Sequence, residues 1–407
     1  MTKLAPAVLN EHIDCIIAES EASLIALRRH FHANPEISRR EFKTTKELQA
    51  RLLGLGGLEI TVREEKVGLV ADLSPPWFDP TQHPTVAIRS DIDALAILEE
   101  TELTFASNNK GVMHACGHDM HMACVTGAAI ALTEFKEQLP GRIRFIYQHA
   151  EETAPGGALD MVREGFMEGV DRIIGLHVDP KLPVGQVGVR IGAFTAATDS
   201  FNLTLHGKGG HSARPHEGTD IVFVLTQILN AYYQATSRLF DARFPIAFAV
   251  GAINGGAAFN VIPDNINARG TIRSVKPEQR ERLLSLFEAI VKSNCALYGA
   301  TFELEIINGS PAVINEAYTT NIITEVATKI LGGQAIIPIS HASMGAEDFS
   351  EFLQVVPGAM FRLGVLGDRP GHFLHSPRFD PDEDAIAIGS RILARSALRL
   401  LSELSEP

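Results

Sequence analysis

The densest group of metal-binding residue types lies in MHACGHDMHMA, residues 113–123. Cys116, His118 and Asp119 supply a thiolate, an imidazole and a carboxylate, which together suit a divalent cation such as Zn²⁺, Mn²⁺, Co²⁺ or Ni²⁺. A structural zinc site usually recruits four Cys or His residues at tight paired spacing, which this segment lacks. Carboxylates among the ligands, with a position left for water, are instead typical of a catalytic metal site.

A second acidic group, Glu151-Glu152, follows the apolar segment RIRFIYQ and the pair His149-Ala150. Neighbouring carboxylates repel one another, and burying both is unfavourable unless cations lie nearby. A site with two metal ions resolves this conflict, because one glutamate binds metal while the other takes a proton from water. Such metals lie about 3.5–4 Å apart and lower the pKa of bound water toward about 7, so a glutamate can act as base near neutral pH.

Polar residues of these types recur directly after apolar segments. Asp91 and Asp93 follow TVAI, Glu151-Glu152 follows RIRFIYQ, and His177 follows RIIGL. Ligands of open parallel α/β sheets bind at the carboxyl ends of the strands, so we expect a metal centre at this edge. Nearer the C-terminus, either Glu347-Asp348 in GAEDFS or the histidines of GHFLHSP, His372 and His375, could return to the same edge and complete the site.

The elements that must position these residues alternate between helices and strands. Apolar spacing predicts helices over about 10–32, 40–54, 119–136 and 156–165, and short apolar runs predict strands over 68–73, 85–88, 142–148 and 171–178. This alternation favours an α/β fold with a largely parallel central sheet that is covered on both faces.

The pattern changes near residue 188. Strongly alternating segments predict strands over 198–206, 267–274 and 301–307, with long helices over about 218–239 and 277–298. This order is typical of a ferredoxin-like α+β domain. We therefore predict a discontinuous metal-dependent catalytic domain, 1–190 and 307–407, interrupted by a lid and dimerisation domain over 191–306.

Composition excludes several classes of protein. The chain has 407 residues, of which 45% are hydrophobic and 21% charged, as in an ordinary globular protein of about two to three domains. Its formal net charge of −13 argues against nucleic acid as a partner, because phosphate backbones require clustered cations.

The sequence also bears on location. No stretch reaches about 18 uninterrupted apolar residues, so we expect no membrane span. The segment MTKLAPAVLNEHIDC lacks the basic and apolar regions of a signal peptide. The four cysteines, Cys15, Cys116, Cys124 and Cys295, form no C-x-x-C pair, which is typical of a reducing compartment. We therefore expect a cytoplasmic protein.

Nine strings occur in the order of a known family. They are RSDIDAL, GVMHACGHDMH, QHAEE, GLHV, GKGGHSARPH, FNVIPD, GTIRS, AEDFS and LHSPRFD. Together they resemble the metallopeptidase family of aminoacylases and carboxypeptidases, and within it the amidohydrolase branch that includes hippurate hydrolase and the indole-acetyl–amino acid hydrolases. The resemblance covers about residues 25–400.

The resemblance implies a dinuclear site with two divalent metal ions per chain, of Zn, Mn, Co or Ni. Glu151 matches the general base of the family, and Asp93 matches a carboxylate that lies beside the site and orients a ligand. The metal ligands that it implies are Cys116, His118, Glu152, His177 and His375.

The resemblance also assigns residues of the predicted insert. His211 matches a histidine that stabilises the tetrahedral oxyanion, often from across a dimer, so a homodimer through the lid domain is expected. Asn260 and Arg273 match positions that contact the carboxylate end of the substrate. An arginine suits that role because its planar fork binds a carboxylate in two places.

One departure from the family concerns the residue before Ala150. Relatives of this branch usually have Q-P-A-E-E, whereas this chain has His149 at the proline position. Both glutamates are kept, so the reaction class is unaffected, but a titratable imidazole is placed near the site.

Structural interpretations compete with these assignments. Cys124 lies on an apolar helix face and is interpreted as core, while His114 and His121 are expected to support the loop or face solvent. Asp119 could orient a ligand or cap a helix, and His372 is expected to be peripheral.

The expected activity is metal-dependent hydrolysis of the amide bond of a small N-acyl amino acid or peptide-like substrate. One alternative is a dipeptidase or carboxypeptidase on the same scaffold. A second is a metal- or peptide-binding relative that has lost catalysis, which an intact Glu151 and a full set of ligands disfavour.

Overall fold

The chain forms two compact units in a computed structural model that describes residues 6–368 and 372–405. The first unit contains the residues up to Gly192 together with Ile314–Ser340 and Asp348 onward, and the second contains Ala193–Val313 and His341–Glu347. The predicted insert, 191–306, does not include the returning segment His341–Glu347. The predictions for residues 1–5, 369–371 and 406–407, including part of the signal-peptide argument, lie outside the described residues.

The first unit is organised around an eight-stranded sheet. Its strands in spatial order are β1 (Glu59–Val62), β2 (Leu69–Leu73), β4 (Arg142–Gln148), β3 (Thr85–Asp91), β5 (Arg172–Pro183), β16 (Gly358–Leu366), β6 (Val187–Val189) and β15 (Ile336–Pro338). The central pairs β4–β3, β3–β5 and β5–β16 are parallel, whereas β1 and β2 add antiparallel strands at one edge. The predicted mostly parallel sheet is therefore confirmed.

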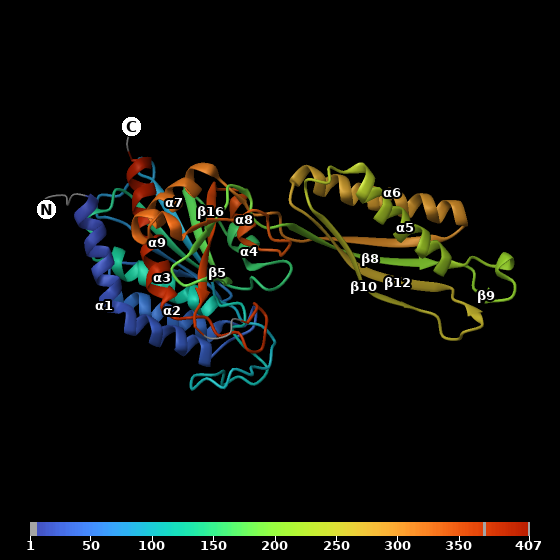
Figure 1. Cartoon of the computed structure of the whole chain (residues 1–407), viewed down its shortest axis with the longest axis horizontal. Coiled ribbons are helices and arrows are strands. Elements are labelled where there is room, and N and C mark those ends of the chain that lie inside the picture. The colour runs from blue at the N-terminus through green and yellow to red at the C-terminus, as the bar shows by residue number, and fades with distance from the viewer. Residues whose placement is uncertain (1–5, 369–371, 406–407) are drawn as a thin grey trace. The chain divides into compact units, whose positions relative to one another are not determined.

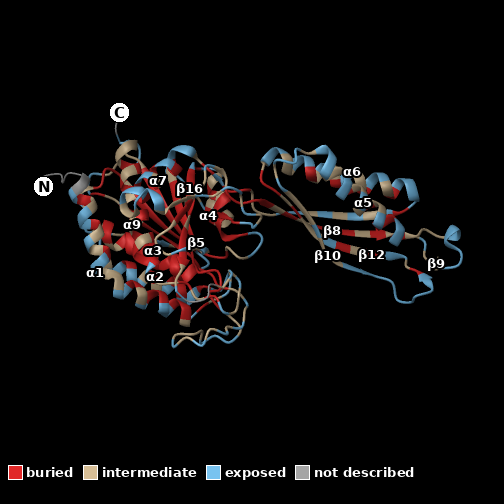
Figure 2. Ribbon diagram, in the orientation of Figure 1, coloured by how far each residue is buried: buried red, intermediate tan, exposed pale blue. Residues whose placement is uncertain are grey.

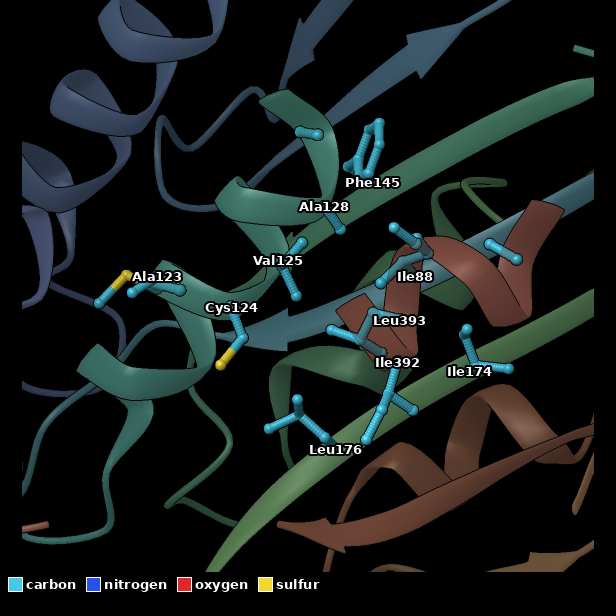
Figure 3. Close-up of a cluster of buried hydrophobic side chains, with 14 of the residues drawn as sticks. Ile88, Ala123, Cys124, Val125, Ala128, Phe145, Ile174, Leu176, Ile392 and Leu393 are labelled. Atoms are coloured by element: carbon cyan, nitrogen blue, oxygen red, sulfur yellow. The ribbon is translucent and has the colours of Figure 1, made fainter. Parts of the chain in front are cut away.

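Long helices cover one face of this sheet (Figures 1 and 2). The helices of the unit are α1 (Pro6–Ala33), α2 (Phe42–Leu55), α3 (His118–Thr133), α4 (Gly157–Arg163), α7 (Ala317–Leu331), α8 (Phe349–Leu353) and α9 (Ala385–Leu404). Figure 3 shows side chains of α3 and α9, such as Cys124 and Ile392, packed with Ile174 and Leu176 of β5. Cys124 is thus a core residue, as interpreted from the sequence.

The short helix α8 packs on the opposite face. Successive side chains of a strand point to opposite faces, and Gly175 lies between Ile174 and Leu176. A Cβ at Gly175 would lie 3.2 Å from the Phe349 ring of α8. The parallel strands are therefore covered on both sides, which explains their nearly continuous apolar sequences.

Helix α3 is buried around nearly its whole circumference, which is typical of a helix enclosed by protein. Its close approach to α9 requires a glycine, because a Cβ at Gly127 would lie 2.3 Å from Ser390 Oγ. The helix that begins at His118 is therefore held between α9, α1 and the sheet, so its N-terminus has a fixed position.

The second unit is a four-stranded antiparallel sheet with two helices. Its elements in chain order are β8 (Ala197–His206), α5 (Ile221–Leu239), β10 (Ile246–Gly255), β12 (Asn265–Ser274), α6 (Pro277–Tyr298) and β13 (Thr301–Asn308). The spatial order is β10-β12-β8-β13, and Phe201, Tyr232 and Phe287 pack between sheet and helices. This confirms the predicted ferredoxin-like arrangement.

Small elements complete the two units. They are the strands β7 (Gly192–Ala193), β9 (Gly210–His211), β11 (Val261–Ile262) and β14 (Ile314–Asn315), with 3₁₀ turns at Lys136–Gln138, Pro215–Glu217 and Gly333–Ala335. Strand β10 was not identified from the sequence, because it is an edge strand with an irregular register between Val250 and Ala252. Within the described part of the chain, no helix has both the length and the apolar character of a membrane span.

Candidate metal centre

The candidate site lies at the carboxyl edge of the central parallel strands. β3 ends at Asp91 and is followed by Asp93, while β4 ends at Gln148 and leads into the turn that carries Glu151 and Glu152. His177 lies within β5. Because these strands are parallel neighbours, their ends meet at one edge, as predicted from the sequence.

The loop before α3 brings Cys116 and His118 to the same edge. Gly117 between them adopts a left-handed backbone with φ 83°, and a Cβ there would lie 2.6 Å from Val178 Cγ2. Both the backbone angle and the close approach require glycine. The turn therefore places the thiol and the imidazole against β5.

The five predicted metal ligands converge. Cys116 Sγ lies 3.5 Å from His177 Nε2, and His375 Nε2 lies 3.3 Å from Glu152 Oε1. His118 Nε2 is 3.9 Å from the same Glu152 oxygen. Two overlapping groups, Cys116 with His118 and His177, and Cys116 with Glu152 and His375, each have ligand atoms within 4.8 Å of one another. This spacing would allow the side chains to bind divalent cations.

The predicted base lies beside these ligands. Glu151 Oε2 is 4.0 Å from His118 Nε2, and the Glu151 side chain is 10% exposed. Its carboxylate also belongs to a group with His118 and Glu152 in which the ligand atoms lie within 4.8 Å. Glu151 is therefore close enough to exchange a proton with water held at the centre.

The imidazoles of His118 and His177 are oriented with Nε2 toward the centre. The Nδ1 atom of His118 lies 2.9 Å from the Asp93 carbonyl oxygen, and Nδ1 of His177 lies 2.8 Å from the Val178 carbonyl oxygen. A ring nitrogen that donates to a carbonyl leaves the other nitrogen with a lone pair for metal.

Two buried atoms test whether a cation fits the site. Among the described residues, His118 Nε2 and Glu152 Oε1 have no partner at full hydrogen-bond geometry, although His375 Nε2 lies 3.3 Å from the Glu152 oxygen. Buried polar atoms are normally satisfied, and these two face one another at 3.9 Å. An imidazole nitrogen and a carboxylate oxygen are both ligands of divalent metals, so the residues present fit bound cations.

The surroundings favour the neutral form of two predicted ligands, His177 and Cys116. Burial, and then the positive charge of Arg362, hold the pKa of His177 well below its usual value, so this imidazole stays neutral. Burial and the Glu152 carboxylate raise the pKa of Cys116 well above that of an ordinary thiol. A cation reverses that shift by stabilising the thiolate, which makes proton release part of metal binding.

Asp93 contacts two of the predicted ligands, His118 and Glu152. Its Oδ2 accepts the Glu152 backbone N–H at 3.0 Å and the Ser38 hydroxyl at 2.6 Å, and its Oδ1 lies 3.2 Å from His118 Nδ1. Although burial raises the pKa of Asp93, its bond to His118 outweighs this and the pKa is lowered. The ionised carboxylate therefore orients two predicted ligands.

The predicted residues of the insert lie within the second unit. His211 and Asn260 are both exposed and are near one another, because Val261 pairs with His211 and the Ser212 N–H donates to the Asn260 carbonyl at 3.1 Å. Arg273 donates from Nη1 to the Met344 carbonyl at 2.8 Å near the other end of β12. Within this unit the structure brings His211 and Asn260 together but not Arg273.

The comparisons with known proteins identify the family of the chain. A family model described as Peptidase family M20/M25/M40 matches residues 87–399. The chain belongs to this family.

Individual relatives cover nearly the whole chain. A probable hydrolase from Synechocystis sp. is 42% identical over 376 residues, which cover 92% of this chain and 94% of that protein. N-acetyl-L-cysteine deacetylase from Bacillus subtilis is 38% identical over 386 residues, covering 95% of this chain and 90% of the enzyme. A solved Bacillus subtilis structure, described as a dinuclear metal binding peptidase from the M20 family, has a TM-score of 0.82 and 32% identity over 95% of this chain and 99% of that chain.

As a member of the M20/M25/M40 family with this group of ligands, the protein is a metal-dependent hydrolase of the amidohydrolase and peptidase type. The predicted resemblance and enzyme class are thereby confirmed. One relative that covers 75% of this chain is named N-acyl-L-amino acid amidohydrolase.

The sequence interpretation missed the role of His121. Together with His114 it was expected to support the loop or face solvent, but both are buried. His121 Nδ1 lies 2.6 Å from Asp91 Oδ1, and its Nε2 accepts the Val178 N–H at 3.0 Å. It therefore joins β3 to the residue after His177. Its position three residues after His118 puts both rings on one face of α3, a signal that could have identified it.

A buried polar network lies behind the same edge. Asp348 accepts hydrogen bonds from Gln148 Nε2 at 2.7 Å, Arg89 Nη2 at 3.1 Å and the Ala158 N–H at 3.0 Å. Arg89 also donates to Asp91 at 2.8 Å. The C-terminal segment GHFLHSP thus supplies His375 to the group of predicted ligands. The segment GAEDFS supplies Asp348 to the polar network behind them.

Asp119 orients no predicted ligand directly. It lies 2.8 Å from Arg28 Nε and 2.8 Å from His32 Nδ1, with all three side chains fully buried. Burial raises its pKa, but the Arg28 charge and the His32 hydrogen bond outweigh this and lower it. The pair with Arg28 ties the start of α3 to α1, so its role is to fix the helix.

His149 proves to be a buried neutral group. Its Nε2 lies 2.7 Å from Arg63 Nη1 and 3.5 Å from Asp160. Burial, and then the Arg63 charge, lower the pKa of His149 to about 4. The imidazole therefore carries no charge near neutral pH.

Proposed function

We propose that the protein hydrolyses the amide bond of N-acyl amino acids or similar small amides, with Glu151 as general base. The single observation that supports this most directly is the position of Glu151, whose carboxylate lies 4.0 Å from a predicted ligand with an unsatisfied nitrogen. Two relatives are named for this chemistry: N-acetyl-L-cysteine deacetylase and N-acyl-L-amino acid amidohydrolase, the latter 39% identical over 307 residues.

In the proposed centre, two divalent metal ions would be held by Cys116, His118, Glu152, His177 and His375. Bound divalent metals supply Lewis acidity, which polarises the amide carbonyl and acidifies water. The Glu151 carboxylate takes a proton from the attacking water and passes it to the nitrogen of the leaving amine. One group can perform both transfers, because it is a base in the first and its conjugate acid in the second.

The insert contributes binding groups in this proposal. His211 donates a hydrogen bond to the oxyanion that forms on the substrate, and Asn260 and Arg273 bind the substrate carboxylate. We further propose that the chain is a homodimer through the insert and that His211 serves the partner copy. The exposure of His211 and Asn260 supports this, because neither side chain is enclosed within its own unit. Cytoplasmic location stays a prediction.

The decisive experiment combines metal content with hydrolysis. The protein is stripped with chelator, reloaded separately with Zn²⁺, Mn²⁺, Co²⁺ or Ni²⁺, and assayed on N-acetyl, N-benzoyl and indole-acetyl amino acids together with dipeptides. We expect about two metals per chain and metal-restored cleavage of acyl amino acids. Loaded protein that cleaves no substrate would favour a binding protein, and failure to bind metal would refute the site.

A carboxypeptidase is the second candidate function. It is favoured by thermostable carboxypeptidase 2 of Saccharolobus solfataricus, which is 38% identical over 387 residues covering 94% of this chain. The same substrate panel separates the two, since a carboxypeptidase or dipeptidase cleaves the dipeptides faster than the acyl amino acids.

A further inference from the structure

Glu41 is a carboxylate that neither the ligand set nor the base assignment uses. It is the residue before α2 and is fully buried, although Arg39 and Arg40 next to it are exposed. Among the described residues it forms no ion pair, and its Oε2 has no partner at hydrogen-bond geometry. Burial and the neighbouring Asp93 charge raise the pKa of Glu41 to about 7. A buried carboxyl group with no ion pair is unfavourable for folding.

The other oxygen holds the backbone directly before the base. Glu41 Oε1 accepts the Ala150 N–H at 2.8 Å, across 109 residues of sequence. Ala150 adopts a left-handed backbone with φ 51°, which is unfavourable for any residue with a Cβ. Glu151 is the next residue, so this conformation sets the direction in which its side chain leaves the chain.

The segment around Glu41 supports the turn at further points. Ser38 donates to Asp93, whose Oδ2 also accepts the Glu152 N–H at 3.0 Å. Arg39 Nη2 donates to the Pro155 carbonyl at 2.9 Å. The amides on either side of the base are therefore each held by a buried carboxyl group, Glu41 before it and Asp93 after it.

We propose that Glu41 is a positioning residue that fixes the Glu151 carboxylate in its working direction through the Ala150 amide. The inference rests on the proposed function, in which Glu151 is the base. Glu41 itself does not touch the substrate or the metals. A displacement of about 1 Å at a reacting group lowers rates by about 100-fold, so a hydrogen bond in this place affects turnover rather than binding.

The test uses substitutions that separate the hydrogen bond from the charge. Glu41→Gln keeps side-chain length and an acceptor oxygen, Glu41→Asp keeps the carboxyl group but is too short to reach Ala150, and Glu41→Leu removes both. We expect kcat to fall about 10- to 100-fold in Glu41→Leu and Glu41→Asp, with KM and metal content within about twofold of wild type. Glu41→Gln should keep most of the wild-type kcat.

A matched control removes the same kind of bond elsewhere. The Asp171 carboxylate accepts the Thr85 N–H at 2.8 Å at the start of β3, the end away from the site. Asp171→Ala should leave kcat unchanged. Glu41→Asp is conservative enough to provide the comparison with Glu41→Gln even if the leucine variant does not fold.

Several outcomes would overturn the inference. They are wild-type kcat in both Glu41→Leu and Glu41→Asp, a Glu41→Gln variant less active than Glu41→Asp, or loss of metal in parallel with kcat. Glu151→Gln, assayed in the same series, shows which proposal fails. If it retains turnover, the base assignment fails and takes this inference with it, whereas an inactive Glu151→Gln beside fully active Glu41 variants refutes only the role of Glu41.

Discussion

The predicted residues of the two units differ in how their own unit holds them. In the first unit His118 is fully buried and His177 is 6% exposed, and each has Nδ1 on a backbone carbonyl. In the second unit His211 and Asn260 are exposed, and the His211 ring accepts the nearby Ala213 N–H at 3.1 Å. His118 and His177 are set in place by their own unit, whereas His211 and Asn260 are presented at a surface.

Because of this difference, we expect substitutions in the two units to affect different properties of the protein. Removing a buried group leaves unsatisfied partners and disturbs metal binding, folding or both. Removing an exposed side chain with one local hydrogen bond leaves the fold unchanged, so any effect must appear in turnover. The following predictions test this contrast from the largest expected effect to the smallest.

The largest effect is expected for Glu151→Gln. The amide cannot accept the proton from water, so kcat should fall by about 10²- to 10⁴-fold. Metal content should stay at the wild-type level, because Glu151 is the proposed base and the five ligands remain. Steady-state kinetics with metal analysis of the same preparation measures both, and near-normal turnover would refute the base assignment.

His211→Ala should lower kcat by about 10²- to 10³-fold, as expected when one oxyanion donor is lost. Metal content and thermal unfolding should not change, since the side chain is exposed. His216→Ala, an exposed histidine in the same unit, is the matched control and should be fully active.

The proposed dimer adds a second measurement. If His211 serves the partner copy, mixing inactive His211→Ala with inactive Glu151→Gln should restore part of the activity, because one mixed site has both groups. A monomeric mass in solution with full activity would contradict the proposal.

Asp93→Asn should weaken metal binding by about 10- to 100-fold, because Asp93 holds both His118 and the Glu152 amide. Competition with a chromogenic chelator measures the affinity. Asp241→Asn removes an exposed ion pair with Arg243 in the second unit and should leave metal affinity unchanged. If Asp93→Asn and Asp241→Asn bound metal with equal affinity, the proposed role of Asp93 in holding the ligands would be contradicted.

The smallest effect concerns His149 and pH. Its folded pKa of about 4 lies below the unfolded value of about 6.5, so between these values the unfolded chain binds more protons. The folded state therefore loses stability as pH falls through this window and loses none above it. His149→Gln removes this effect. Relative to wild type, the free energy of unfolding of the variant should therefore be about 2 kcal/mol higher at pH 4.5 than at pH 7.5.

Urea unfolding at the two pH values measures this difference. The dependence of kcat on pH between about 6 and 8 should be the same in both proteins, because the imidazole is neutral throughout that range. A change in that range would show that His149 titrates near the base.

The sequence was sufficient for features that depend on neighbouring residues. The periodicity of 142–148 predicts β4 with the bounds observed, and 277–298 does the same for α6. The ends of some elements were predicted less accurately. The predicted strand 171–178 continues to Pro183 as β5, because pairing with β16 extends it. The grouping of Cys116, His118 and Glu152 was also predictable, since each adjoins an element whose end lies at the same edge.

The supporting contacts were not predictable, because their partners come from distant parts of the chain. Glu41 and Ala150 are 109 residues apart, and Gln148 and Asp348 are 200 apart. Nothing local to Glu41 distinguishes it from an exposed glutamate at a helix start. Burial and the approach of the Ala150 amide exist only after the sheet and α2 have packed.

The sequence by itself determined the residue types at the strand ends, the two folds and the family, because periodicity and motif order are properties of the chain. Only the tertiary structure decided which nitrogen of His118 and His177 faces the centre, that His149 is neutral, and that His121, Asp91 and Glu41 support the site. These properties depend on the dielectric surroundings and on hydrogen-bond partners, which are defined by packing rather than by sequence position.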